Sequence, residues 1–511
     1  MVESNNTSAN KRIARNSIFM SIRMVIVLCI TLYTTRVLLN ALGVEDYGVY
    51  NVVCGFVSMF AFLNTSMSNG IQRFFNFELG KNGVEGAKKV YNTSLLIQFL
   101  LTIIIVILTE SFGLWYMHYK MVIPPERFVA AQWIFQFSII SLVFVIMQAP
   151  YAAAIMAHER MDFYAIVSVL DAFLKLAIVL VLPFISADLL IIYGLLVMLI
   201  SIVNFLLYYG YSKRKFEEIQ FDKTFHRDLF KSMIGFSGWN IFGSLSGVMK
   251  EQGINLVLNA FFGPVVNAAR GVAAQVNSGI LGFVSNITIP VRPQVVQSYS
   301  KGDTKRVMNL TYSISKLSCF FLYLLALPIC YEIDYVLHLW LGNNVPEHAS
   351  VFVVIILMTS MMNNLNGAIS AVVHATGIMR KYQLISSVTV LSSIPLAYFG
   401  LQLGLCPEFA LWMVFLSMTL AQIAALVILK GLIEYSIKDY ITKVLCPITF
   451  VIISTIWIPY IIKSNIELGF MRFFIEGVTS VLVVCISVYF LGLNNTEKNL
   501  IKSMVTSARH K

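Results

Sequence analysis

Four basic residues lie well inside long apolar stretches of this sequence, at Arg23, Lys250, Arg270 and Lys316. A charged side chain at the centre of a membrane helix costs about 2.5–3.5 kcal/mol on insertion scales, so such residues normally face water or a partner. In a poorly hydrated cavity, ammonium and guanidinium groups bind phosphate oxygens, and arginine offers them a planar fork. The four residues are therefore candidates for an anion-binding site.

Two acids, Asp171 and Glu251, also lie well inside apolar stretches. Asp171 is four residues before Lys175, at the spacing of a helical ion pair. Glu251 follows Lys250 directly, which places the two about 100° apart around a helix. We expect Lys250 to face a cavity while Glu251 pairs with a basic group on a neighbouring helix. The alternative is a structural pair with span 265–297. An acid beside a lysine in an enclosed site changes its proton or sodium occupancy as its surroundings move, so both acids are candidates for ion coupling.

A third set of residues is suited to gating. Arg73 follows the weak helix-forming stretch Ser68-Asn69-Gly70, and Arg292 is flanked by Pro290 and Pro293. Glycine and proline weaken or bend helices, so both sites are predicted hinges near the inner mouth of the protein. The structural alternatives are arginines that reach the interface and ordinary proline kinks.

The elements that position these residues are membrane helices. Of 511 residues, 58% are hydrophobic and 12% are charged, and the mean hydropathy is +0.77. Apolar segments of about 20 residues, enough for a helix to cross a bilayer, recur along the chain. They lack the alternation of outer-membrane barrel strands. We predict an all-α integral membrane protein. Its fourteen expected spans are 14–41, 46–76, 89–116, 128–156, 163–185, 188–211, 233–261, 265–297, 307–331, 349–378, 382–403, 408–431, 443–463 and 470–492.

Basic residues concentrate on one side of the predicted membrane. With both tails and the even-numbered connections on that side, it holds 25 Lys or Arg residues, against 4 on the other side. Because basic residues in short loops stay in the cytoplasm, we expect both termini there. The polar, basic N-terminus precedes a long apolar stretch, which indicates a retained first span and not a cleaved signal peptide.

Several classes of function are disfavoured by the composition. The net charge of +11 reflects cytoplasmic anchoring and the basic residues within spans, so no nucleic-acid partner is expected. The seven cysteines are scattered, as small core residues are. Neither an HExxH spacing nor a GxxxxGK[ST] loop occurs, so we expect no metal site, no cofactor and no ATPase activity in the chain itself.

The chain contains an internal repeat at an offset of 219 residues. VLLNA at 37–41 lies over LVLNA at 256–260, and Arg73 falls on Arg292. Further matches are KNG at 81–83 with KGD at 301–303 and, at an offset of 217, Asn92 with Asn309. Because six spans is an even number, the second copy enters the membrane from the same side as the first. This predicts two parallel lobes related by a pseudo-two-fold axis along the membrane normal.

The predicted organisation follows from this repeat and from the longest polar interruption. It comprises an N-lobe at 1–212 (six helices), a cytoplasmic linker at 213–232, a C-lobe at 233–432 (six helices), two appended C-terminal helices at 443–492 and a cytoplasmic tail at 493–511.

This pattern resembles a known transporter family. Two six-helix lobes with two extra helices, the basic segment KRIARNSIFMSIR at 11–23, the stretch GIQRFFNFELGKNG at 70–83 and short outer loops resemble the polysaccharide-transporter branch of the multidrug, oligosaccharidyl-lipid and polysaccharide exporter superfamily. The resemblance covers the chain from about Asn10 to Leu493.

The resemblance implies a flippase of the bacterial inner membrane. Such proteins move a lipid-linked oligosaccharide repeat unit, typically on undecaprenyl pyrophosphate, to the outer leaflet for O-antigen, capsule or exopolysaccharide synthesis. They work by alternating access, commonly with a sodium or proton gradient, and enclose a cationic cavity, to which we assign Arg23, Lys250, Arg270 and Lys316. The implied partners are the lipid-linked oligosaccharide, membrane lipids and the polysaccharide polymerase machinery.

Three alternatives remain open at this stage. A multidrug exporter of the same superfamily would favour acids in its cavity, whereas this chain has a basic surplus inside its spans. A flippase for the peptidoglycan lipid precursor would share the cationic cavity. A membrane-embedded polysaccharide polymerase or acyltransferase would need a large outer loop or a constellation of His and Asp residues. Of such chemistry the only hint is His338 and His348, in the connection 332–348.

Overall fold

The computed structural model describes residues 2–158, 160–222, 224–288, 295, 298–299, 302–376, 380–432, 436–494 and 497–498. Within these ranges every regular element is a helix. Eleven helical segments of the described residues are long and apolar enough to cross a membrane. The prediction of an all-α, multi-pass membrane protein is confirmed.

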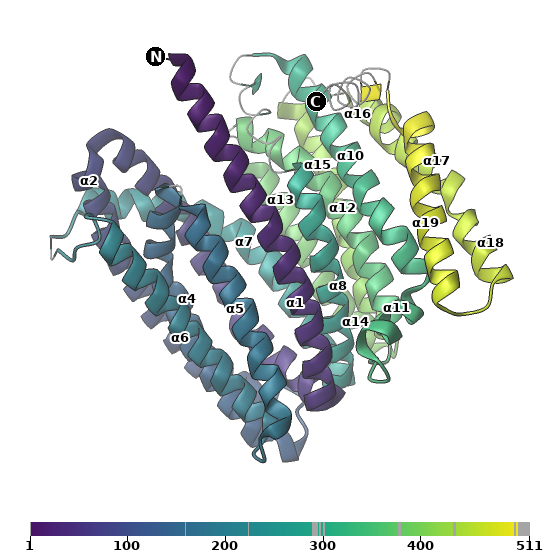
Figure 1. Ribbon diagram of the computed structural model, residues 1–511, viewed down its shortest axis with the longest axis horizontal. Helices are drawn as coiled ribbons and strands as arrows, with labels where there is room; N and C mark the ends of the chain where they lie inside the picture. The colour runs from purple at the N-terminus through teal and green to yellow at the C-terminus, as the bar shows by residue number, and fades with distance from the viewer. Residues whose placement is uncertain are drawn as a thin grey trace. The chain divides into compact units, whose positions relative to one another are not determined.

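The chain forms two compact units, and the first contains the residues up to Gly271 together with Ala397–Ala410. Within it α4 packs against α6 and α2, α1 packs against α5, and α2 packs against α7. Figure 1 shows α4, α5 and α6 running alongside one another. The helices are α1 (Val2–Ser58), α2 (Ala61–Leu108), α3 (Leu114–Tyr119), α4 (Phe128–Ala157), α5 (Met161–Val181), α6 (Leu189–Lys215), α7 (Arg227–Phe262) and the first turns of α8 (Pro264–Thr288).

The second unit contains Val272–Leu396 and the chain from Leu411 onward. In it α10 packs against α12 and α19, and α19 also packs against α17 and α18; the last three carry the yellow end of the colour scale (Figure 1). Beyond the rest of α8, the helices from Thr304 onward are α10 (Thr304–Tyr331), α11 (Ile333–Leu341), α12 (Ala349–Thr376), α13 (Arg380–Leu391), α14 (Ser393–Gln402, shared with the first unit), α15 (Glu408–Leu432), α16 (Ile437–Tyr440), α17 (Cys446–Thr455), α18 (Trp457–Asn465) and α19 (Phe470–Ser487).

The fourteen predicted spans coincide with helix in the parts that the structure describes, although three of them are interrupted there. The predicted span 46–76 breaks at Met59–Phe60, the span 382–403 at Ser392 and the span 443–463 at Ile456. The boundary between the two compact units falls within α8 and not in the linker at 213–232. The lobe boundaries inferred from the repeat stay a prediction.

The repeat has a counterpart in the backbone. Gly43 and Gly263 each end a helix with positive φ values of 79° and 74°. Gly83 and Gly302, which are 219 residues apart, also have positive φ values, 61° and 73°. Left-handed backbone of this kind is accessible mainly to glycine. The two copies therefore use glycine for the same local turn at matching positions, as a duplication predicts.

Glycines also allow close helix packing in the first unit. A Cβ atom added at Gly48 of α1 would lie 2.0 Å from the carbonyl oxygen of Pro264, and one at Gly55 would lie 2.6 Å from the Gln252 side chain. A Cβ at Gly271 would lie 3.0 Å from Asn51. Small residues let membrane helices approach backbone to backbone. They bring α1 against the end of α7 and the start of α8.

We expect Gly48→Ala to destabilise the protein, because the new methyl group clashes with backbone that has no flexible side chain to move aside. Overpacking of this kind typically costs about 1–3 kcal/mol. The measurement is the thermal unfolding midpoint of purified protein in detergent. The matched control is Gly210→Ala in α6, where an added Cβ meets no atom within 4 Å. Equal unfolding midpoints for the two variants would contradict the close packing described here.

Candidate functional site

Three charged residues of the first unit form one cluster on α7 and α8. The Glu251 carboxylate accepts from Arg270, with Oε2 2.9 Å from Nη2, and its Oε1 lies 2.8 Å from Lys250 Nζ. Glu251 thus pairs across to α8, as the structural alternative proposed. The expectation that Lys250 and Glu251 would diverge is wrong, because the long lysine side chain folds back to its neighbour.

Exposure distinguishes the members of this cluster. The Arg270 and Lys250 side chains are 10% and 13% exposed, whereas that of Glu251 is 55% exposed. Lys250 lies roughly 18 Å from the C-terminal end of α7 at 1.5 Å per residue, and a hydrocarbon core is about 30 Å thick. An ionised carboxylate exposed at such depth is tolerated in contact with water, not with lipid. Glu251 thus requires contact with water, and the cluster carries one more positive than negative charge.

Arginine donors in this unit are only partly used. Nε of Arg270 is buried without a hydrogen-bond partner among the described residues, and the same is true of Nε of Arg23. The Arg23 guanidinium on α1 donates to Ser168 Oγ at 3.3 Å and lies 5.2 Å from the ring centre of Tyr164. Within the described part of the chain, no carboxylate forms an ion pair with Arg23. Both arginines retain the capacity to bind an anion.

Asparagine side chains next to the cluster tie helices together. Asn267 donates to the backbone oxygen of Asn255 at 2.8 Å and to its Oδ1 at 2.7 Å, and Asn255 donates to the Asn51 carbonyl at 3.4 Å. Asn259 pairs with both backbone polar groups of Val122, at 2.9 and 3.1 Å. These amides act as contacts between segments of the first unit.

The other predicted coupling acid, Asp171, is held by two partners. Its Oδ2 lies 2.8 Å from Lys175 Nζ, and its Oδ1 accepts from Asn204 on α6 at 2.7 Å. The charge of this acid is therefore balanced within α5. A role in coupling for either Asp171 or Glu251 stays a prediction.

Lys316 lies apart from these residues, in the second unit. It is 3% exposed, and its Nζ lies 2.7 Å from Glu497 Oε2. Glu497 also accepts from Ser313 Oγ at 2.8 Å and from the Asn494 backbone at 2.9 Å. A residue assigned to the cytoplasmic tail thus packs onto α10 and neutralises Lys316. We leave Lys316 out of the site proposed below.

Of the predicted gating residues, the structure describes Arg73 alone. It is exposed on α2, which continues through Gly70 without a break. The interruption lies earlier, at Met59–Phe60. There the backbone forms hydrogen bonds between residues three apart, such as the one from Phe60 N–H to the Val57 carbonyl oxygen at 3.2 Å. Arg292, Pro290 and Pro293 lie outside the described residues.

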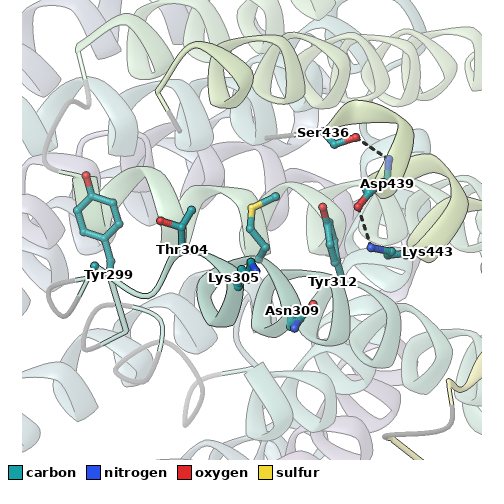
Figure 2. A pocket seen from close by; sticks show the side chains of 10 residues that line it. Tyr299, Thr304, Lys305, Asn309, Tyr312, Ser436, Asp439 and Lys443 are labelled. Carbon is teal, nitrogen blue, oxygen red and sulfur yellow. Dashed lines mark hydrogen bonds and ion pairs between the residues drawn. The ribbon is translucent and has the colours of Figure 1, made fainter. Parts of the chain in front are cut away.

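A second polar site is a cavity of about 980 Å³ in the second unit, between the start of α10 and α16. Figure 2 shows Lys305, Asn309 and Tyr312 along α10, with the Asp439–Lys443 pair facing them. Lys443 Nζ lies 2.7 Å from Asp439 Oδ2 and 5.6 Å from the ring centre of Tyr312. Lys443 is thus neutralised, so the cavity carries a single surplus positive charge, from Lys305.

The first unit has a smaller cavity, of about 460 Å³, at the matching residue Asn92. Asn92, which matches Asn309, donates to the Gln220 carbonyl at 3.0 Å and accepts from the Asp222 backbone at 2.7 Å. The chain between α6 and α7 therefore covers that asparagine. Asn309, by contrast, is exposed in the cavity wall.

Comparison with known proteins identifies the fold. No family model matches the chain, and no curated protein matches it by sequence. A solved structure of the lipid II flippase MurJ in an inward closed conformation matches with a TM-score of 0.69 and 14% identity, over 92% of this chain and 98% of that one. The chain shares the fold of this structure.

Two other solved structures match over less of the chain. An inward-facing multidrug resistance MATE family transporter has a TM-score of 0.65 at 14% identity, over 81% of this chain and 97% of that one. A MOP superfamily transporter from Pyrococcus furiosus has a TM-score of 0.60 at 15% identity, over 81% of this chain and 95% of its own.

Sequence reasoning missed the polar groups that α18 and α19 bring to the end of α10. Arg472 is buried and forms an ion pair with Glu332: its Nη2 donates to Oε2 at 2.7 Å, and its Nε lies 2.7 Å from Oε1. Glu476, one helical turn after Arg472, is fully buried. The i, i+4 spacing of Arg472 and Glu476 was the available signal.

Proposed function

We propose that this protein is a flippase that moves a lipid-linked oligosaccharide, carried on undecaprenyl pyrophosphate, across the bacterial inner membrane by alternating access. The observation that carries the proposal is the Lys250–Glu251–Arg270 cluster, in which two buried bases meet one exposed acid. A pyrophosphate group requires several cationic donors in a poorly hydrated cavity. Arg270 supplies an unused Nε donor, and Arg23 supplies another.

The fold comparisons support a flippase in preference to a drug exporter. The MurJ structure matches 92% of this chain, whereas the MATE structure matches 81%. A site for organic cations would present uncompensated carboxylates, but Glu251 and Asp171 are both paired with bases. We further propose cytoplasmic termini, energy from an ion gradient, and cooperation with the polysaccharide polymerase machinery, for O-antigen, capsule or exopolysaccharide synthesis.

The peptidoglycan precursor flippase is the second candidate, because it also handles a polyprenyl pyrophosphate. The amides beside the cluster do not discriminate between sugars. Gln252 and Gln275 make no hydrogen bond with a described residue, so they are the amides in this region with capacity for hydroxyl groups.

Transport by purified protein in proteoliposomes tests the proposal. A fluorescent undecaprenyl-pyrophosphate oligosaccharide should become accessible to a membrane-impermeant quencher or glycosidase on the opposite leaflet, and an imposed proton or sodium gradient should change the rate. The peptide-bearing precursor lipid and a fluorescent organic cation serve as competing substrates. Faster transport of either competitor, with no movement of the oligosaccharide lipid, would reject the proposed substrate class.

A further inference from the structure

The second unit contains a buried carboxyl group whose charge no base neutralises. Glu476 on α19 has no exposed surface. Its Oε1 accepts from Ser480 Oγ at 2.8 Å, and its Oε2 is buried without a hydrogen-bond partner among the described residues. A carboxylate in such a place would lose its hydration without regaining equivalent interactions.

The buried base next to Glu476 on α19 is already occupied. Arg472 lies one turn before Glu476, but its guanidinium forms two contacts of 2.7 Å with Glu332 and donates to the Ile466 carbonyl at 3.4 Å. Arg472 and Glu332 are 9% and 1% exposed. One guanidinium therefore stands between two buried acids and neutralises Glu332.

The other ionisable groups around Glu476 do not change this balance. From α18, Lys463 acts on Glu476 electrostatically, but it is exposed and its Nζ donates to the Tyr331 carbonyl at 2.8 Å. The phenol of Tyr331 at the end of α10 also interacts with Glu476; it is neutral and donates to the Ile456 carbonyl at 2.6 Å. Counting Lys463, the four groups balance in number, but Lys463 is exposed; the three buried groups, Glu332, Arg472 and Glu476, are two acids and one base.

We propose that Glu476 is a proton-binding site, at which the carboxyl group takes up a proton at Oε2 and stays neutral while the Glu332–Arg472 pair is closed. A proton fits better than a metal ion. Hard cations take about six or more oxygen ligands, and the described residues contain no group of three or more His, Cys, Asp or Glu side chains placed to hold a metal. Protonation removes the excess charge with no further ligand.

The arrangement is also switchable. Because Arg472 and Glu476 are four residues apart on one helix, an opening that separates Glu332 from Arg472 and brings Glu332 to water would free Arg472 to neutralise Glu476, which would then release its proton to water. Proton binding is thereby linked to the contact between the end of α10 and α19. Under the proposed function this linkage is a route for proton coupling. The two acids predicted for that role, Asp171 and Glu251, are already neutralised by bases in the first unit.

Infrared difference spectroscopy of the purified full-length protein, without substrate, tests proton binding directly. Stepping the pH from mildly acidic to mildly basic should remove the carbonyl band of one protonated carboxyl group per chain, and Glu476→Gln should abolish that band. Glu110→Gln, which alters a half-buried acid near the end of α2, is the matched control and should keep it. A band that survives in Glu476→Gln, or its absence from the unmodified protein, would overturn the proposal.

Thermal unfolding provides a second measurement, which remains informative if a variant folds poorly. Ionising Glu476 creates a buried charge without a partner, so the unfolding midpoint of the unmodified protein should fall as the pH rises. In Glu476→Gln the midpoint should not fall. Glu332→Gln should also remove the dependence, because Arg472 becomes available to Glu476. A pH dependence unchanged in both variants would contradict the site.

The transport consequence rests on the proposed function and is measured separately. In proteoliposomes, Glu476→Gln should retain transport of the oligosaccharide lipid down its own gradient and lose its response to an imposed proton gradient. If proton binding is found but the response persists, the coupling role fails and the site stands. If the protein transports no oligosaccharide lipid at all, the proposed function fails, and the spectroscopic result is unaffected.

Discussion

Replacing Arg270 by alanine should reduce binding and transport of the oligosaccharide lipid about tenfold to a hundredfold or more, while the protein still inserts and folds. Each hydrogen bond between a charged donor and a phosphate contributes about 1.5–3 kcal/mol, and 1.4 kcal/mol corresponds to a factor of ten. The substitution also leaves the exposed Glu251 carboxylate with Lys250 as its remaining base, so the cluster loses its positive surplus.

Companion variants separate a binding role from a structural one. Arg270→Lys should restore part of the activity, because the charge returns but the two-pronged donor does not. Arg23→Ala should show a loss of similar direction. Arg160→Ala is the matched control, since Arg160 forms an exposed pair with Asp162, and exposed pairs contribute little. Surface polysaccharide in cells and transport in proteoliposomes are the measurements. Normal values in both Arg23→Ala and Arg270→Ala would remove the pyrophosphate assignment.

Replacing Arg472 by alanine should produce the largest loss of stability in the second unit. Glu332 would be left with 1% of its side chain exposed and no base to neutralise it. Breaking a buried ion pair by removing one partner typically costs about 3–5 kcal/mol, because the remaining charge is uncompensated. The expected result is a marked fall in the unfolding midpoint in detergent and in the amount of protein in the membrane.

A double variant shows whether the loss arises from the stranded charge. Arg472→Met combined with Glu332→Leu replaces the pair by apolar side chains of similar size, and such replacements are often neutral or stabilising. We expect it to recover most of the lost stability. Lys463→Ala is the control, since its ammonium group is exposed and donates to one backbone carbonyl. A double variant as unstable as Arg472→Ala would show that the charge is not the cause.

The helices themselves were accessible from the sequence. Hydrophobicity over about 20 residues is a local property that decides where a chain crosses a bilayer. The predicted spans accordingly coincide with helix, from α1 to α19. Gly83 and Gly302, in the matched tripeptides KNG and KGD, both adopt positive φ. The break at Met59–Phe60 was not predicted, because neither residue is proline or glycine. Backbone hydrogen bonds between residues three apart accompany it.

The sequence also identified the charged residues that lie inside apolar runs, because the free-energy cost of placing a charge in the membrane depends on its position in the span. It did not determine their partners. Glu251 pairs with Arg270, which is 19 residues away in the sequence. Arg472 and Glu332 are 140 residues apart, and Lys316 and Glu497 are 181 residues apart. Such pairs depend on which helix faces lie together and on how far flexible side chains reach. For that reason the composition and pattern of the chain specified a helical membrane protein with buried charges. The tertiary structure decided that Lys316 is neutralised, that Arg270 keeps an unused donor, and that the buried Glu476 forms no ion pair with a described base.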